Sequence, residues 1–474
     1  MNVTDRLSRW PRARPDADAL VRSDGSTIAW RDLDRAVDAH ARGCAALGIR
    51  AGDVVMLAVL DAHRLLLLQL GLMRLGAAPT PPTLPARLAS RCLTDADRDP
   101  GLHSRTQRVA AAMFESAGAA FPRLDDPDGV AIVCPSSGTN GIPKSMAITH
   151  AMLDARIAIA DAGVPMPDAP RQILLGSATG YGILTALRVL GAGGALVFAP
   201  SPDDIPDTIE RRRVDRIAVM PWSVQRIVAS RPAGAGPLAS LRQLEVGGER
   251  LPEPLWRLAR ERICAEIWSV YGATECGTIA VGALETADFA RGELGRVLPG
   301  VTIAAFDDDG RRLPDGAQGS LCMRGAGCVT GYLGDDALSA ATFRDGWFVT
   351  GDLGSVEAGR VMMSGRAADL VNLGGIKLAL GTIEDVARSV DAVADVAAFG
   401  ALSVNGVAHI GLAVVPRARL DVAAIRAVFA AKLPGFAPSL ILAVDALPRG
   451  AGGKVRRDML ASMATEQGFG PPAT

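Results

Sequence analysis

The chain has 474 residues, of which 49% are hydrophobic and 21% are charged, and its formal net charge is −1 at pH 7. A chain of this length exceeds what one ordinary hydrophobic core holds, so we expect a globular protein with two or more domains. The balanced charge provides no basic surplus for binding nucleic acid or an acidic membrane surface. We interpret the arginine run at 211–213 as a solvated helix end.

Cysteines, histidines and apolar stretches bear on the compartment and on metal binding. The seven cysteines form no C-x-x-C pair, and their odd number argues against the disulfide framework of a secreted domain. The N-terminal stretch lacks the apolar core of a signal peptide, and the run LLLLQLGLMRLGAA is interrupted by Gln69 and Arg74. We therefore expect a cytoplasmic protein without a membrane span. The five histidines are isolated from other ligand residues, so a zinc site is not expected.

Short apolar runs alternate with helical patterns along the first 250 residues. Residues 54–60 predict a strand and residues 62–75 a helix. Four further β-rich runs follow, at 172–176, 194–200, 216–222 and 243–248. This alternation predicts an α/β fold with a mainly parallel sheet covered by helices on both faces. Ligands of such sheets bind beyond the carboxyl ends of the strands, where the glycine-rich segments of this chain fall.

The pattern changes after residue 300. The segment VTIAAFDDDGRRLPDGAQGSLCMRG predicts two strands joined by a polar turn, and hence a β-rich subdomain. Beyond MMSGRAADL, we expect a small α+β domain built from a helix at 382–389, strands at 394–402 and 409–416, and a helix at 421–433. We divide the chain into an N-terminal domain, 1–366, and a C-terminal domain, 367–474.

The segment CPSSGTNGIPKS, at 134–145, has the composition of a phosphate-binding loop. Glycines allow several backbone N–H groups to point at one anion, and hydroxyl groups and Lys144 add further donors. A Walker A loop would need a second glycine where Pro143 stands, and proline supplies no N–H. The segment therefore does not fit a P-loop NTPase, and by itself it also fits an ordinary polar turn.

Four later segments contain the residue types that an ATP site needs: SVYGATECG, FVTGDLG, SGRAADLVNLGGIK and LPRGAGGKVRRDML. The ring of Tyr271 can stack on a purine, and the Glu275 carboxylate can hold Mg²⁺. Asp352 can accept hydrogen bonds from both hydroxyls of a ribose, and Lys454 lies in a glycine-rich loop. Taken singly, each also fits a structural role: a turn aspartate, a helix-start glutamate or a surface lysine.

Together and in this order, the motifs resemble those of the adenylate-forming superfamily of acyl- and aryl-CoA synthetases, peptide-synthetase adenylation domains and luciferases. SSGTNGIPK matches the phosphate loop of that family, with Asn140 in place of a more usual threonine. YGATE matches its nucleotide motif, TGDL its ribose motif, and PRGAGGKVRR its terminal lysine motif. The likeness extends from about residue 26 to about residue 460.

The resemblance implies an N-terminal domain of layered αβαβα sheets and a two-step ligase reaction. An acid and ATP, with Mg²⁺, would form an acyl-adenylate and pyrophosphate, and the acyl group would then pass to the pantetheine thiol of CoA or of an acyl or peptidyl carrier protein. The implied catalytic residues are Lys454, Thr274, Glu275 and Arg366, with Glu275 also as the metal ligand. The implied nucleotide-binding residues are Ser136, Ser137, Gly138, Thr139, Asn140, Gly141, Lys144, Gly247, Gly248, Glu249, Tyr271, Gly272 and Asp352.

The second step implies a rotating C-terminal domain and a thiol tunnel. Gly374 and Gly375 would let the pantetheine arm pass close to the backbone. Ala368 stands at the hinge, where many relatives carry aspartate or lysine.

Substrate choice is expected to depend on a pocket near the carboxyl ends of the strands. Its implied residues are Ser177, Gly180, Tyr181, Trp222, Val246, Ala273 and Gly277. Amino-acid-activating domains commonly carry aspartate where Ser177 stands, and a buried ammonium without that counter-charge is costly. The sequence therefore favours an uncharged acyl or aryl acid of small to medium size.

Two alternatives remain open in the sequence. A non-catalytic relative that binds nucleotide or acyl-adenylate agrees with the departures at Asn140, Ser177 and Ala368. The retention of Glu275 and Lys454 favours an enzyme. An amino-acid-activating adenylation enzyme is the second alternative.

Overall fold

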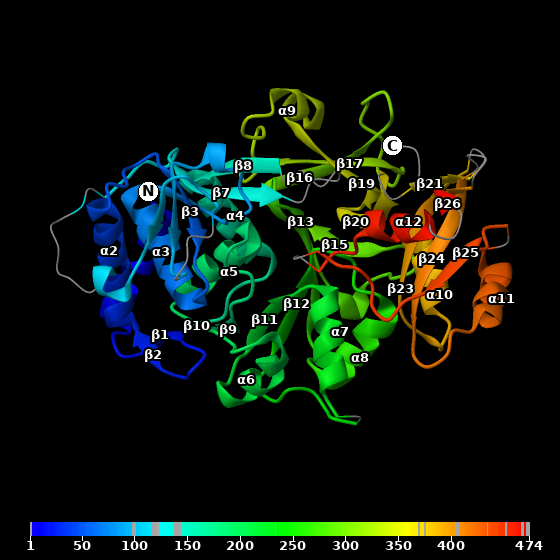
Figure 1. Cartoon of the computed structure of the whole chain (residues 1–474), viewed down its shortest axis with the longest axis horizontal. Coiled ribbons are helices and arrows are strands. Elements are labelled where there is room, and N and C mark those ends of the chain that lie inside the picture. Colours follow the sequence, from blue (N-terminus) through cyan, green and yellow to red (C-terminus); the bar gives the residue numbers. More distant parts are fainter. Residues whose placement is uncertain are drawn as a thin grey trace.

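The computed structural model describes most of the chain and has a mixed α/β fold, as the sequence predicts (Figure 1). The described residues are 2–96, 101–114, 121, 123–136, 144–232, 234–367, 370–373, 376–403, 408–433, 435–450, 453–465 and 469–470. None of the described helices is long and apolar enough to cross a membrane.

The largest sheet has a parallel half that contains four of the predicted strand runs. Its parallel strands, in spatial order, are β1 (Asp18–Val21), β10 (Ala195–Val197), β9 (Arg171–Ile173), β11 (Arg216–Val219), β12 (Gln243–Gly247) and β13 (Ile267–Ala273). At its outer edge, β2 (Thr27–Ala29) pairs antiparallel with β1. The parallel strands all begin at one edge of the sheet, the amino edge, and all end at the opposite edge, the carboxyl edge.

Helices cover both faces of this parallel half. Consecutive residues of β10, Leu196 and Val197, belong to different hydrophobic clusters, and successive side chains of a strand point to opposite faces. The first cluster includes residues of α3 (Ala62–Leu75), α4 (His150–Gly163) and α5 (Gly180–Gly191). The second includes residues of α6 (Ile205–Arg211), α7 (Pro221–Ser230) and α8 (Glu253–Arg262). The predicted two-sided arrangement is therefore confirmed.

A second parallel sheet lies near the N-terminus and contains β4 (Ala78–Thr80), β3 (Val54–Ala58), β5 (Arg91–Thr94) and β6 (Thr106–Arg108). Helix α3 follows β3, and its bounds agree with the sequence prediction. The Asp61 carboxylate accepts from the Arg64 N–H at 3.0 Å and caps its first turn. Gly76, at φ +82°, ends it in the left-handed conformation that glycine adopts without strain. Helices α1 (Trp10–Ala13) and α2 (Trp30–Ala46) complete this region.

The antiparallel half of the main sheet continues from β13. It consists of β14 (Gly277–Ala283), β15 (Glu293–Val297), β20 (Arg360–Arg366), β19 (Trp347–Glu357), β17 (Gly319–Gly325) and β16 (Val301–Phe306). The two strands predicted after residue 300 are β16 and β17, which pair antiparallel. Helix α9 (Asp336–Thr342) and strand β18 (Phe343–Arg344) lie beside β19.

The C-terminal elements form a sheet of their own at one end of the molecule, coloured orange to red in Figure 1. Its strands are β25 (Leu440–Ala443), β24 (Ala408–Pro416), β23 (Val393–Ser403) and β26 (Phe469–Gly470), preceded by the hairpin β21 (Leu370–Leu373) and β22 (Ile376–Ala379). Helices α10 (Leu380–Arg388), α11 (Val422–Lys432) and α12 (Arg457–Thr465) pack there, and Ile383, Leu412 and Phe429 share one buried cluster. The predicted helices and strands are confirmed, and the domain division after residue 366 stays a prediction.

Candidate active site

The carboxyl edge of the main sheet brings together predicted site residues that are far apart in the sequence. Strand β12 ends at Gly247 and strand β13 at Ala273. Helix α5 begins at Gly180, where an added Cβ would lie 3.1 Å from the Cys134 Sγ and 3.9 Å from the Thr274 Cγ2. The start of α5 therefore lies against both the nucleotide motif and the strand that leads into the phosphate loop.

The ends of the predicted phosphate loop lie opposite each other. Strand β7 (Val130–Ser136) and strand β8 (Lys144–Thr149) form an antiparallel hairpin in which Ser136 pairs with Lys144. Lys144 therefore starts a strand at a fixed position next to the loop. The intervening predicted residues Ser137, Gly138, Thr139, Asn140 and Gly141 lie outside the described part of the chain, as do Ala368, Gly374 and Gly375.

Asp352 is held by two predicted site residues. The Tyr271 hydroxyl donates to its Oδ2 at 2.8 Å, and the Arg366 Nε donates to its Oδ1 at 3.0 Å. Asp352 and Arg366 are direct partners in the pairing of β19 with β20, which explains their contact. Burial and the Asp352 charge raise the pKa of Tyr271 well above its usual value, so its hydroxyl keeps the proton that it donates. The adenine-stacking role of Tyr271 stays a prediction.

Glu275 is oriented by a residue that the sequence analysis did not select, Tyr332. The Tyr332 hydroxyl donates to the Glu275 Oε1 at 3.0 Å, and both side chains are buried. The Lys144 Nζ lies 5.2 Å from the centre of the Tyr332 ring, within the range of a cation–π contact. Tyr332 therefore connects the end of the phosphate loop to the predicted metal ligand. Its sequence signal is weak: an aromatic residue with a hydroxyl in the glycine-containing stretch GCVTGYLG.

Arg156, on α4, is a second residue that sequence reasoning missed. Its guanidinium donates to the backbone carbonyls of Thr274 at 3.0 Å, Glu275 at 2.9 Å and Gly327 at 2.7 Å. The side chain is only 4% exposed, and this burial lowers the pKa of Arg156 to about 10. At Gly277, with φ +78°, an added Cβ would lie 2.8 Å from the Arg156 Cγ. Arg156 thus fixes the nucleotide motif, and the space it fills explains why position 277 is glycine.

Three of the seven cysteines lie in or next to this region. A disulfide joins Cys276 to Cys328, which ties the nucleotide motif to the stretch that leads to Tyr332. The other five cysteines are buried thiols. Among them, burial raises the pKa of Cys134 to about 12, so this residue before the phosphate loop stays a neutral thiol.

The C-terminal lysine segment lies against the N-terminal site. An added Cβ on Gly453 would lie 3.7 Å from the indole of Trp222. Burial lowers the pKa of Lys454, and the nearby Arg366 lowers it further, whereas the charges of Glu249, Asp352 and Glu275 raise it. The charges that act on Lys454 are therefore those of predicted catalytic and nucleotide-binding residues. An ion pair between Arg250 and Asp385 on α10 is a second contact between these parts of the chain.

The predicted substrate pocket contains one exposed aromatic residue and a buried charge that sequence reasoning missed. Tyr181 is 39% exposed, and its hydroxyl donates to the Glu245 Oε2 at 3.3 Å. Glu245 is 4% exposed and pairs with Arg216, while the Arg188 Nη1 lies 3.8 Å from its Oε2. Val246 belongs to the hydrophobic cluster beneath α7 and α8, so its place in the pocket stays a prediction.

A family model of AMP-binding enzymes matches residues 7–333. The chain belongs to the AMP-binding enzyme family. The family is part of the adenylate-forming superfamily that the motifs resemble, so that resemblance is confirmed.

Curated relatives and solved structures agree with this membership. The chain is 30% identical over 505 residues to novobiocin biosynthesis protein H from Streptomyces niveus, covering 96% of this chain and 81% of that protein. It is 29% identical over 372 residues to the indoleacetate–CoA ligase of Aromatoleum aromaticum, covering 76% of this chain and 72% of that protein. The structure of ATP-bound MatB from Rhodopseudomonas palustris shares its fold, with a TM-score of 0.87, 22% identity, and coverage of 98% of this chain and 99% of that one.

Proposed function

We propose that this AMP-forming acid–thiol ligase activates a small or medium-sized, uncharged acyl or aryl acid with the residues that its sequence predicts. The enzyme forms an acyl-adenylate from the acid and ATP, releases pyrophosphate, and transfers the acyl group to a thiol. The observation that carries the assignment of residues is the position of Lys454. Its neighbour Gly453 lies against the indole of Trp222, and the charges of Glu275 and Asp352 raise the pKa of Lys454, although it comes from the far end of the chain.

In the first half-reaction, a carboxylate oxygen of the acid attacks the α-phosphorus, and the bond to the pyrophosphate oxygen breaks. Both reactants are anions, so cations must lie where they meet. Lys454 would bridge the attacking carboxylate and the α-phosphate, Thr274 would donate to the α-phosphate, and Lys144 would bind the outer phosphates. The nucleotide sugar would lie at Asp352, whose orientation Tyr271 and Arg366 fix. Much of the rate enhancement would come from this positioning.

The carboxylate of Glu275 fits a magnesium ion. Mg²⁺ prefers oxygen ligands and is usually held by one or two carboxylates together with phosphate oxygens and waters. Glu275 is buried, and the Tyr332 hydroxyl fixes one of its oxygens, so its orientation is set before a metal binds. When bound, the ion would offset the negative charge of the phosphates.

The surroundings of the predicted pocket support an uncharged acid. Ser177 carries no charge, and the buried Glu245 already pairs with Arg216 and accepts from Tyr181. A substrate ammonium would therefore have to compete with a buried ion pair for its counter-charge, which is costly. This argues against the amino-acid-activating alternative.

The acceptor in the second half-reaction is proposed to be the pantetheine thiol of CoA or of an acyl or peptidyl carrier protein. The names of two relatives, indoleacetate–CoA ligase and medium-chain fatty-acid–CoA ligase, support a CoA thiol. The relatives also include peptide synthetases such as PhsC, so a carrier protein is also a candidate acceptor. Gly374 and Gly375 would line the thiol path and Ala368 would be the hinge. The need for ATP favours the expected cytoplasmic location, whereas the Cys276–Cys328 disulfide is unusual in a reducing compartment.

ATP–pyrophosphate exchange tests this proposal on the purified chain with separate pools of short acyl, medium acyl, hydroxyacyl, aryl and amino acids. We expect exchange with an acyl or aryl pool and none with amino acids. Exchange with amino acids alone would overturn the pocket assignment. Retained ATP binding without exchange in any pool would favour the non-catalytic alternative. Product masses with CoA and with a pantetheine-loaded carrier protein then distinguish the acceptors.

A further inference from the structure

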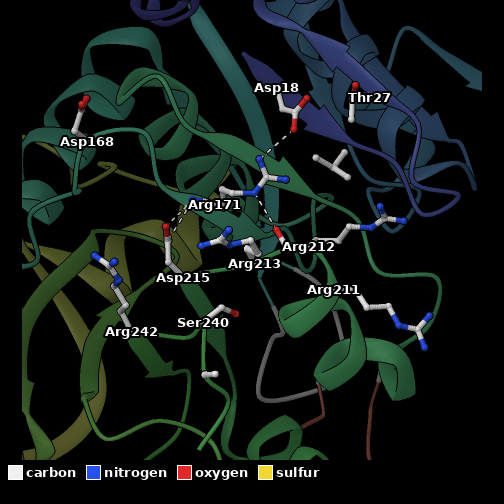
Figure 2. A pocket seen from close by; sticks show the side chains of 12 residues that line it. Asp18, Thr27, Asp168, Arg171, Arg211, Arg212, Arg213, Asp215, Ser240 and Arg242 are labelled. Carbon is white, nitrogen blue, oxygen red and sulfur yellow. Dashed lines mark hydrogen bonds and ion pairs between the residues drawn. The ribbon is translucent and has the colours of Figure 1, made fainter. Parts of the chain in front are cut away.

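A hollow lies at the amino edge of the main sheet, away from the candidate active site at the carboxyl edge. Its volume is about 650 Å³, and its walls are rich in charged side chains (Figure 2). We call it the amino-edge pocket and define it by these lining residues: Asp18, Val21, Thr27, Asp168, Arg171, Arg211, Arg212, Arg213, Asp215, Ala239, Ser240 and Arg242. Pockets of 300–1,000 Å³ are the usual size for small ligands.

The five arginines of the pocket come from three places in the chain. Arg171 is the first residue of β9, the run 211–213 stands at the end of α6, and Arg242 precedes β12. They converge because parallel strands begin at the same edge of the sheet. The predicted helix end at 211–213 is confirmed, since α6 ends at Arg211. The arginines beyond that end also line a concave site.

The aspartates of the pocket already have partners. The Asp18 Oδ2 lies 3.1 Å from the Arg171 Nη1, and the Asp168 Oδ2 lies 2.6 Å from the Arg14 Nη2. Asp215 accepts from the backbone N–H of Arg171 at 3.1 and 3.2 Å. Figure 2 shows Arg171 between Asp18 and Asp215, in contact with both. The carboxylates therefore hold the pocket wall in shape, and they neutralise only part of its positive charge.

Arg212, Arg213 and Arg242 provide the remaining charge, and Arg213 and Arg242 are the exposed members of this set. Within the described ranges, the side chains of Arg213 and Arg242 form no ion pair or hydrogen bond, and both are exposed. Arg211, by contrast, pairs with Asp207 at 3.0 Å. The backbone of Arg213 is at φ +52°, a left-handed conformation that a long side chain adopts at an energetic cost. The lining as a whole has five arginines against three aspartates.

We propose that the amino-edge pocket binds a small phosphate-bearing anion through Arg213 and Arg242. Guanidinium groups bind phosphate oxygens with two parallel hydrogen bonds, and several converge here from separate elements. The three aspartates would repel an extended polyanion such as a nucleic acid, so the confined volume and the mixed charge favour a small ligand. The site is separate from the phosphate loop, because that loop joins β7 to β8 and its Lys144 contacts Tyr332 near the carboxyl edge.

Calorimetric titration of the full chain with pyrophosphate, without Mg²⁺ or ATP, tests the proposal. The titration is done on a Lys144→Ala background to weaken binding at the active site. We expect the double variant Arg213→Gln/Arg242→Gln to bind about tenfold more weakly or worse, because it removes two guanidinium groups that donate charge-assisted hydrogen bonds to phosphate oxygens. The control Arg260→Gln removes an exposed arginine of α8, which pairs with Glu285, and is expected to change nothing. Equal affinity in the double variant and the control would overturn the proposal.

Ala239 offers a second test that leaves the arginines in place. It is exposed on the pocket wall, so either a glutamate or a lysine fits there without burying a charge. We expect Ala239→Glu to weaken pyrophosphate binding severalfold and Ala239→Lys to strengthen it, with both effects reduced by added salt. Equal effects of the two substitutions would show that the pocket does not bind the anion by charge.

Discussion

The two edges of the main sheet differ in whether their charged side chains are buried or exposed. At the carboxyl edge, the Asp352 and Glu275 carboxylates are buried, and each accepts a hydrogen bond from a tyrosine hydroxyl. At the amino edge, Arg213 and Arg242 are exposed, and neither side chain forms a hydrogen bond or a close ion pair among the described residues. Buried, oriented carboxylates cost folding free energy but stand ready for a reacting ligand, whereas exposed arginines cost little and adapt to a ligand when it arrives. The first edge is therefore suited to catalysis and the second to reversible binding.

The largest effect is expected for Lys454→Ala, which removes the cation at the reacting centre. ATP–pyrophosphate exchange should fall by a factor of about 10² or more, as when a single transition-state donor is removed. ATP affinity, measured by calorimetry, should stay nearly unchanged because the other nucleotide contacts remain. Lys432→Ala, on the surface of α11, is the matched control. Full exchange activity in the Lys454 variant would contradict its catalytic role.

The second effect concerns stability and compares one arginine at each edge. Arg156→Met leaves three backbone carbonyls without their donor and should lower the free energy of unfolding by about 3–5 kcal/mol. Arg242→Met should change it by less than about 0.5 kcal/mol, because the side chain is exposed. Denaturant unfolding of both variants gives the comparison. Similar losses would mean that the two edges do not differ as their contacts indicate.

A smaller effect is expected for Tyr332→Phe, which removes the hydroxyl that orients Glu275. Loss of a hydrogen bond behind a metal ligand typically weakens metal affinity by 10–100-fold, so the Mg²⁺ concentration for half-maximal exchange should rise by about tenfold. The maximal rate at saturating Mg²⁺ should recover most of its normal value. A control, Tyr181→Phe, removes a hydroxyl bound to Glu245 and should leave the Mg²⁺ dependence unchanged. An unaltered Mg²⁺ requirement in the Tyr332 variant would argue against Glu275 as the metal ligand.

Sequence reasoning was most successful where the information is local. The alternation of strands and helices, the bounds of α3 and the glycine-rich strand ends follow from short patterns, and the structure has them in the expected order. Arg156 and Tyr332 were missed because their partners are distant in the sequence: Tyr332 is 57 residues from Glu275, and Arg156 is 171 residues from Gly327. Glu245 was missed for another reason. It lies in a strand whose sequence pattern is mostly apolar. The arginines that compensate for the cost of burying its charge come from α5 and β11.

The smallest expected effect is a shift in the pH dependence of exchange. Burial and Arg366 lower the pKa of Lys454 from its usual value. Its protonated form is the one that can bridge two anions, so exchange should be full below the lowered pKa and fall as the pH rises through it. Lys454→Arg keeps a cation that does not titrate in this range, so its exchange, although lower, should no longer decline at the same alkaline pH. Identical alkaline limbs in the native chain and the arginine variant would assign the decline to a group other than Lys454.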